Sequence, residues 1–105
     1  MQRLNCQNQN VYETTIRNRN FLLFVDMEQN TTHIYTETDD ANIYYLEDRI
    51  GTFGNPDECA KTAEKYINGV IDTIEYCRAR WMEWSKTGEP VLGYPRRINK
   101  NELAA

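Results

Sequence analysis

The chain has 105 residues, of which 40% are hydrophobic and 27% charged, with a net charge of −4. This is the composition of an ordinary globular domain, and it excludes a disordered chain and a chain with the ~20-residue apolar run of a bilayer span. The odd number of cysteines, three, argues against a disulfide framework. We therefore expect a single cytoplasmic domain, acting in its own cell or in a host cell.

The first half of the chain has the pattern of a β meander. Residues 1–10 are a polar lead that we expect to be flexible. Residues 11–50 are rich in β-branched and aromatic side chains in the segments VYETTIR, FLLFVDM, HIYTET and NIYYLEDRI. The polar breaks NRN, EQNTT and DDAN suit turns between antiparallel strands. The pattern predicts three or four antiparallel strands.

The second of these segments is apolar on both faces of the predicted sheet. Phe21, Leu23, Val25 and Met27 point one way, and Leu22 and Phe24 point the other. A strand with two apolar faces needs a cover on each. One cover is the predicted helix, and the other is either the polar lead or a partner.

A long helix is predicted from residue 56 to residue 86. Asn55 suits the N-cap and Pro56 the first helical position, while Gly88 and Pro90 suit the end. The fold class expected is therefore α+β, with the meander packed on one long helix. A short extended tail follows the helix.

The predicted helix is longer than the sheet can cover. Its residues span roughly 46 Å, against about 23 Å for a seven-residue strand. Its second half narrows to an apolar stripe that contains Trp81 and Trp84, with Arg78 and Arg80 beside it. Three covers for the tryptophans stay open: the tail at residues 88–105, a second copy in a homodimer, or another macromolecule.

The segment IGTFGNPDECAKTAEKYI resembles the strand-to-helix junction of AP2-type DNA-binding domains. The resemblance covers under a fifth of the chain, and it implies a sheet laid on one helix. It does not extend to function, because the preceding strands are acidic and lack the arginines and tryptophans with which that family reads DNA.

Catalytic and cofactor sites are not predicted. His33 is the only histidine, and we expect it to be a surface or hydrogen-bonded residue. Cys59 and Cys77 are expected to be buried and inert and Cys6 to be exposed. The three cysteines and His33 are too few and too far apart for a structural zinc site, and the GTFGNP segment lacks the pattern of a phosphate-binding loop. The protein is therefore expected to be non-enzymatic and to need neither metal nor cofactor.

Acidic and basic residues are unevenly distributed between the two halves of the chain. Residues 11–58 carry ten acidic and three basic residues, and residues 59–105 carry six acidic and eight basic residues. An acidic β half suits a basic protein partner better than nucleic acid. The predicted partner-binding residues are Glu37, Asp39, Asp40, Glu47, Asp48, Arg78, Arg80, Trp81 and Trp84.

The expected function is stoichiometric binding that inhibits or sequesters another protein, as immunity, antitoxin and phage anti-defence proteins do. One alternative is a small nucleic-acid-binding module that uses the C-terminal arginines Arg78, Arg80, Arg96 and Arg97. A second alternative is a small-ligand-binding domain.

Overall fold

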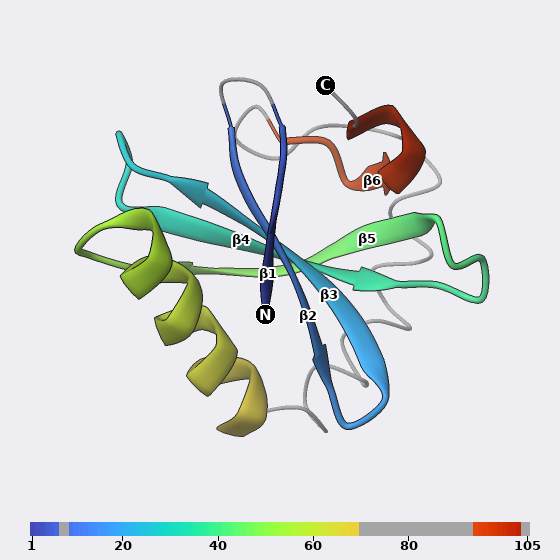
Figure 1. The fold of residues 1–105 in the computed structure, drawn as a ribbon, viewed down its shortest axis with the longest axis horizontal. Coiled ribbons are helices and arrows are strands. Elements are labelled where there is room, and N and C mark those ends of the chain that lie inside the picture. The colour runs from blue at the N-terminus through green and yellow to red at the C-terminus, as the bar shows by residue number, and fades with distance from the viewer. Residues whose placement is uncertain (7–8, 70–93, 104–105) are drawn as a thin grey trace.

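The computed structural model of the chain describes residues 1–6, 9–69 and 94–103. Most of it is a curled antiparallel sheet of six strands in chain order (Figure 1). The strands are β1 (Gln2–Leu4), β2 (Asn10–Ile16), β3 (Arg19–Asp26), β4 (Thr31–Glu37), β5 (Ile43–Gly51) and β6 (Arg97–Asn99). A 3-10 helix, η2 (Lys100–Leu103), follows β6. A helix begins at Pro56 and is described as far as residue 69.

The predicted architecture, three or four strands packed on one long helix, is wrong. The four predicted segments do form β2 to β5, but the lead and the tail add β1 and β6 as edge strands. Each edge strand is only three residues long, which is too short for a recognisable alternation of apolar and polar residues in the sequence. The described helix is short, and residues 70–86 of the predicted helix lie outside the described residues.

One face of the sheet packs against the helix. This cluster contains Tyr12, Ile16, Phe21, Leu23, Val25, Ile34, Cys59, Ala60, Ala63 and Ile67. Ala60 and Ala63 are fully buried, and their small side chains let the helix backbone approach the strands closely. The helix of the described structure thus provides the first of the two covers that β3 needs.

The other face of the sheet is concave and has its own apolar cluster, formed by Val11, Leu22, Phe24, Tyr35, Tyr44, Leu46 and Ile98, with Leu4, Cys6, Tyr94 and Leu103 at its margin. Both ends of the chain therefore contribute to the second cover. Cys6, expected to be exposed, is half-buried, and burial raises the pKa of its thiol. Cys59 is buried as expected, and Cys6 and Cys59 are free thiols, whereas Cys77 lies outside the described residues.

Two local irregularities fix the register of the sheet. Arg17 and Asn18 form a tight two-residue turn between β2 and β3, both with positive φ angles of 51° and 65°. Between β4 and β5 the register shifts by one residue, which leaves Glu47 as a bulge. A bulge bends its strand and increases the local twist, which suits the curl of the sheet.

The start of the helix is closed by a reciprocal pair of hydrogen bonds. The Asn55 side-chain oxygen accepts from the Glu58 backbone N–H at 2.9 Å, and the Glu58 carboxylate accepts from the Asn55 N–H at 3.2 Å. This capping box satisfies two backbone donors at the helix start. The predicted N-cap at Asn55 is confirmed.

We predict that Asn55→Ala lowers the free energy of unfolding by about 1 kcal/mol, because it removes the cap. Urea denaturation measures the change, with the exposed helical substitution Lys61→Ala as the control. Equal stability of the Asn55 and Lys61 variants would contradict the capping role.

Candidate functional site

A short loop between β5 and the helix holds Phe53 in solvent. Phe53 is 75% exposed, yet the residue before it is almost fully buried. The Thr52 hydroxyl is hydrogen-bonded to the Thr32 hydroxyl at 2.8 Å, and the Thr52 N–H donates to the Asn30 carbonyl at 2.9 Å. The residue after Phe53, Gly54, has a φ of 110°, a conformation that favours glycine. The loop is thus fixed on both sides of an exposed phenylalanine.

Acidic and apolar side chains lie on the two segments that adjoin this loop. The bond from Thr52 to Asn30 brings the β3–β4 turn beside it, and that turn carries Met27, which is 38% exposed. The first helical turn carries Asp57, which accepts a hydrogen bond from the Tyr12 hydroxyl. Burial and this bond raise the pKa of Tyr12 to about 12. We call the set Phe53, Met27, Glu28, Asp57 and Glu58 the Phe53 surface.

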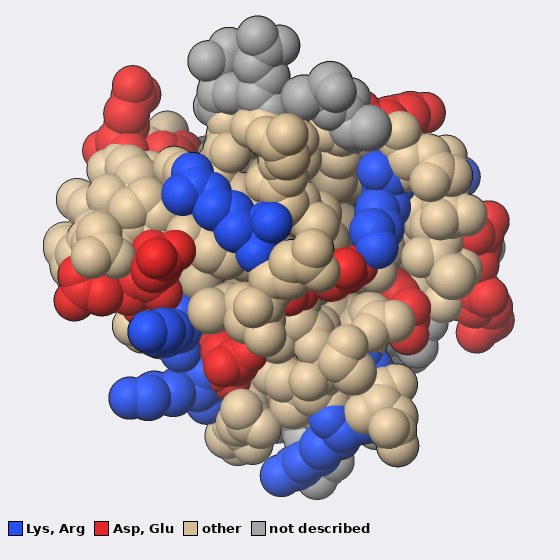
Figure 2. All heavy atoms as spheres, in the orientation of Figure 1, with Lys and Arg blue, Asp and Glu red and all other residues tan. Residues whose placement is uncertain are grey.

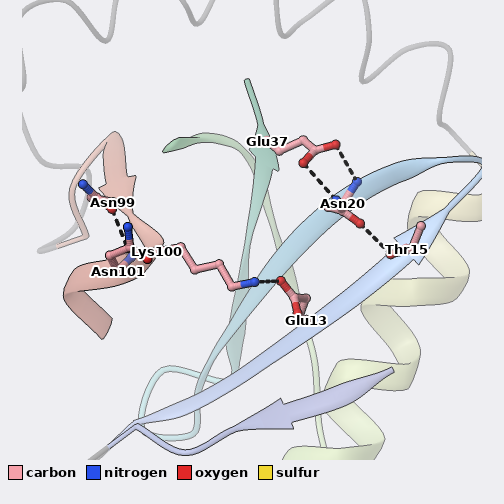
Figure 3. Close-up of polar contacts among 7 residues, drawn as sticks. All are labelled: Glu13, Thr15, Asn20, Glu37, Asn99, Lys100 and Asn101. Carbon is pink, nitrogen blue, oxygen red and sulfur yellow. Dashed lines mark hydrogen bonds and ion pairs between the residues drawn. The ribbon is translucent and has the colours of Figure 1, made fainter. Parts of the chain in front are cut away.

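The predicted acidic residues Glu37, Asp39 and Asp40 lie together at the opposite end of β4. Asp39 and Asp40 are exposed in the β4–β5 turn, where the Asp40 carboxylate accepts the Asn42 N–H at 3.0 Å. Figure 3 shows that the Glu37 carboxylate is held by Asn20 of β3, at 2.9 Å from its side-chain amide. Asp39 and Asp40 are therefore the more accessible carboxylates at this end.

The other two predicted acidic residues, Glu47 and Asp48, are buried or hydrogen-bonded within the protein. Glu47 is only 4% exposed at the bulge of β5. Asp48 lies on the helix face, where its carboxylate accepts a hydrogen bond from the Tyr66 hydroxyl. Glu47 is buried and Asp48 is half-buried, so both carboxylates are less accessible to a partner than exposed carboxylates that also accept hydrogen bonds, such as Asp57.

The predicted C-terminal anchors, Arg78, Arg80, Trp81 and Trp84, lie outside the described residues. Of the other two arginines proposed for nucleic acid, Arg97 is exposed on β6 and Arg96 is half-buried. Figure 2 shows basic and acidic side chains interspersed over one face of the molecule, not gathered into a basic patch.

A polar network at one end of the concave face ties the C-terminal segment to the sheet. Figure 3 shows Lys100 of η2 reaching the Glu13 carboxylate of β2, with which it forms an ion pair. Beside it the Thr15 hydroxyl donates to the Asn20 side-chain oxygen at 2.5 Å. Because these side chains bond to one another, we assign the network a role in holding the fold and not in binding a partner.

His33 is a second feature that the sequence did not reveal. It is fully buried on the concave face, and its ring stacks on Tyr94 with centroids 3.7 Å apart and planes at 17°. Neither ring nitrogen makes a hydrogen bond of normal geometry with a described residue, although a backbone contact with Phe24 acts on the ring. The ring is buried, so the expectation of a surface residue is wrong. Burial lowers the pKa of His33, and the Asp26 carboxylate only partly offsets this.

Within residues 1–6, 9–69 and 94–103, no group of three or more His, Cys, Asp and Glu side chains is placed to hold a metal ion. Across the same ranges, no helix has both the length and the apolar character needed to cross a membrane. Comparison with protein families, with curated proteins and with solved structures gives no match to this chain. The functional assignment therefore depends on the geometry of its surface.

We predict that Thr52→Val lowers the free energy of unfolding by about 1 to 3 kcal/mol, because it leaves the buried Thr32 hydroxyl without its partner. The double variant Thr32→Val/Thr52→Val removes both hydroxyls with little change in shape, and we expect it to lose less than the single variant. Urea denaturation of the three proteins tests this. A double variant that loses the sum of two costly single changes would contradict the pairing.

Proposed function

We propose that the protein acts by stoichiometric binding to another protein through the Phe53 surface and has no turnover of its own. The observation that carries this proposal is the exposure of Phe53 on a loop that hydrogen bonds hold in place. A single exposed apolar side chain is common on protein surfaces. An aromatic ring fixed in solvent is different, because part of the ordering cost of binding has already been met during folding.

The chemistry around Phe53 indicates the kind of partner. Glu28 lies in the adjoining turn and Asp57 and Glu58 in the first helical turn, and all three are exposed. Carboxylates at the rim of an interface attract a basic partner and raise its association rate, whereas a buried aromatic anchor mainly slows dissociation. The partner proposed is thus a protein with an apolar pocket bordered by lysine or arginine.

Binding of this kind would inhibit or sequester the partner, in the manner of immunity, antitoxin or phage anti-defence proteins. A cytoplasmic site of action is part of the proposal, supported by the free thiols of Cys6 and Cys59. The exposed pair Asp39 and Asp40 stays a predicted second contact, at the far end of β4 from Phe53.

The test begins by replacing Phe53 with a photoreactive phenylalanine analogue in the full chain and cross-linking in the native cell. The captured protein is then purified and its binding kinetics are measured. We expect Phe53→Ala to raise the dissociation rate constant at least about tenfold, because it removes the buried anchor. Lys65→Ala, which shortens an exposed side chain on the helix, serves as the control.

A pair of charge reversals locates the contact. We expect Glu28→Lys to slow association and to weaken its salt dependence, while Asp39→Lys at the opposite end has little effect. The reverse result would move the interface to the Asp39 and Asp40 turn. Binding that neither reversal nor Phe53→Ala changes would refute the Phe53 surface. A low-salt gel shift abolished by alanine at Arg96 and Arg97 would favour the nucleic-acid alternative.

A further inference from the structure

Tyr94 stands between two hollows on the concave side of the molecule. One has a volume of about 400 Å³ and includes Asp26, Met27 and Glu28 in its lining. The other has a volume of about 580 Å³ and is lined on its far side by β6 and η2 residues. Both hollows share Gln9, Phe24 and Tyr94 as lining residues. The Tyr94 ring is therefore a common wall of the two spaces.

Contacts with described residues hold this ring over the sheet. It stacks on His33 and meets the edge of Phe24 with centroids 6.2 Å apart. Burial raises the pKa of its hydroxyl, and the charge of Asp26 and a hydrogen bond to that carboxylate add to the rise. The chain behind Tyr94 is anchored separately, because the Pro95 carbonyl accepts from the Tyr35 hydroxyl at 2.7 Å. Movement of the Tyr94 ring would therefore remove one of the contacts that attach residues 94–103 to the sheet.

His33 beneath the ring is placed to respond to protonation. The cross-strand register puts Phe24 of β3 on one side of it and Arg49 of β5 on the other. The charged and titratable groups that act on it are Asp26, Arg49 and Tyr94. Protonation would create a buried cation with two N–H donors, and the described structure offers neither of them an acceptor of normal geometry. Attraction of the cation to the Tyr94 ring, to Asp26 and to the Phe24 backbone offsets only part of this cost.

We propose that Tyr94 is a gate that closes over neutral His33 and opens when His33 is protonated, joining the two hollows into one cleft floored by Phe24. In the closed state the pKa of His33 lies below its ordinary value of 6.5, and in the open state it returns toward that value. The closed state therefore keeps its full stability above pH 6.5 and loses it as the pH falls below that value. For one proton, the change in the open population is at most about tenfold per pH unit.

The first test uses the wild-type chain, whose single histidine gives one set of ring signals in an NMR titration. We expect those signals to titrate below pH 6.5, with ring protons shifted by the aromatic stack at neutral pH. Titration at or above 6.5 would overturn the gate, whatever the fate of any variant.

The second test is hydrogen exchange in residues 94–103 at about pH 7.5 and about pH 5. After correction for the intrinsic rate, we expect protection in the wild type to fall about tenfold at the lower pH. The variant His33→Phe keeps an aromatic ring under Tyr94 but cannot be protonated, so its protection should stay within about twofold. Tyr94→Ala should have low protection at both pH values. Equal falls in the wild type and in His33→Phe would overturn the proposal.

Discussion

The structure depends on one constraint: strand β3 carries large apolar side chains on both of its faces. Phe21 to Val25 are at most 5% exposed, so the sheet is stable only if each face has a cover. The helix from Pro56 covers one face with small side chains that permit close approach. The concave face is covered by residues from both ends of the chain, including Leu4 of β1 and Ile98 of β6. Two separate apolar clusters on one sheet follow from this requirement.

Both candidate functional features lie where a cover joins the sheet. Phe53 lies between the end of β5 at Gly51 and the helix cap at Asn55 and belongs to neither apolar cluster, although hydrogen bonds on both sides hold its loop. Tyr94 begins the C-terminal segment and rests on His33 at the margin of the concave cluster. The first feature offers a rigid anchor to a partner, and the second offers a ring that can move. Neither is part of the close-packed interior.

The sequence predicted the features that depend on neighbouring residues. Alternation and turn chemistry located β2 to β5, and Asn55 and Pro56 marked the helix start. Features set by distant contacts were missed, because β1 and β6 are too short for a pattern and His33 meets Tyr94 from the far end of the chain. Glu47 was missed for a different reason, since a one-residue bulge changes the face on which each later side chain falls. The position of Phe53 fits neither the alternation of a strand nor the period of a helix. This mismatch was the sequence feature that could have identified Phe53 as an exposed residue.

The most direct test of this account compares the neighbours Leu22 and Leu23, which point to opposite faces of β3. Urea denaturation of Leu22→Ala and Leu23→Ala measures what each face contributes to the free energy of unfolding. If both faces are covered, each substitution should cost about 2 to 5 kcal/mol, as expected for a leucine lost from a packed core. A cost below about 1 kcal/mol for Leu22→Ala, with a full cost for Leu23→Ala, would show that the concave face is open to solvent and would contradict the account.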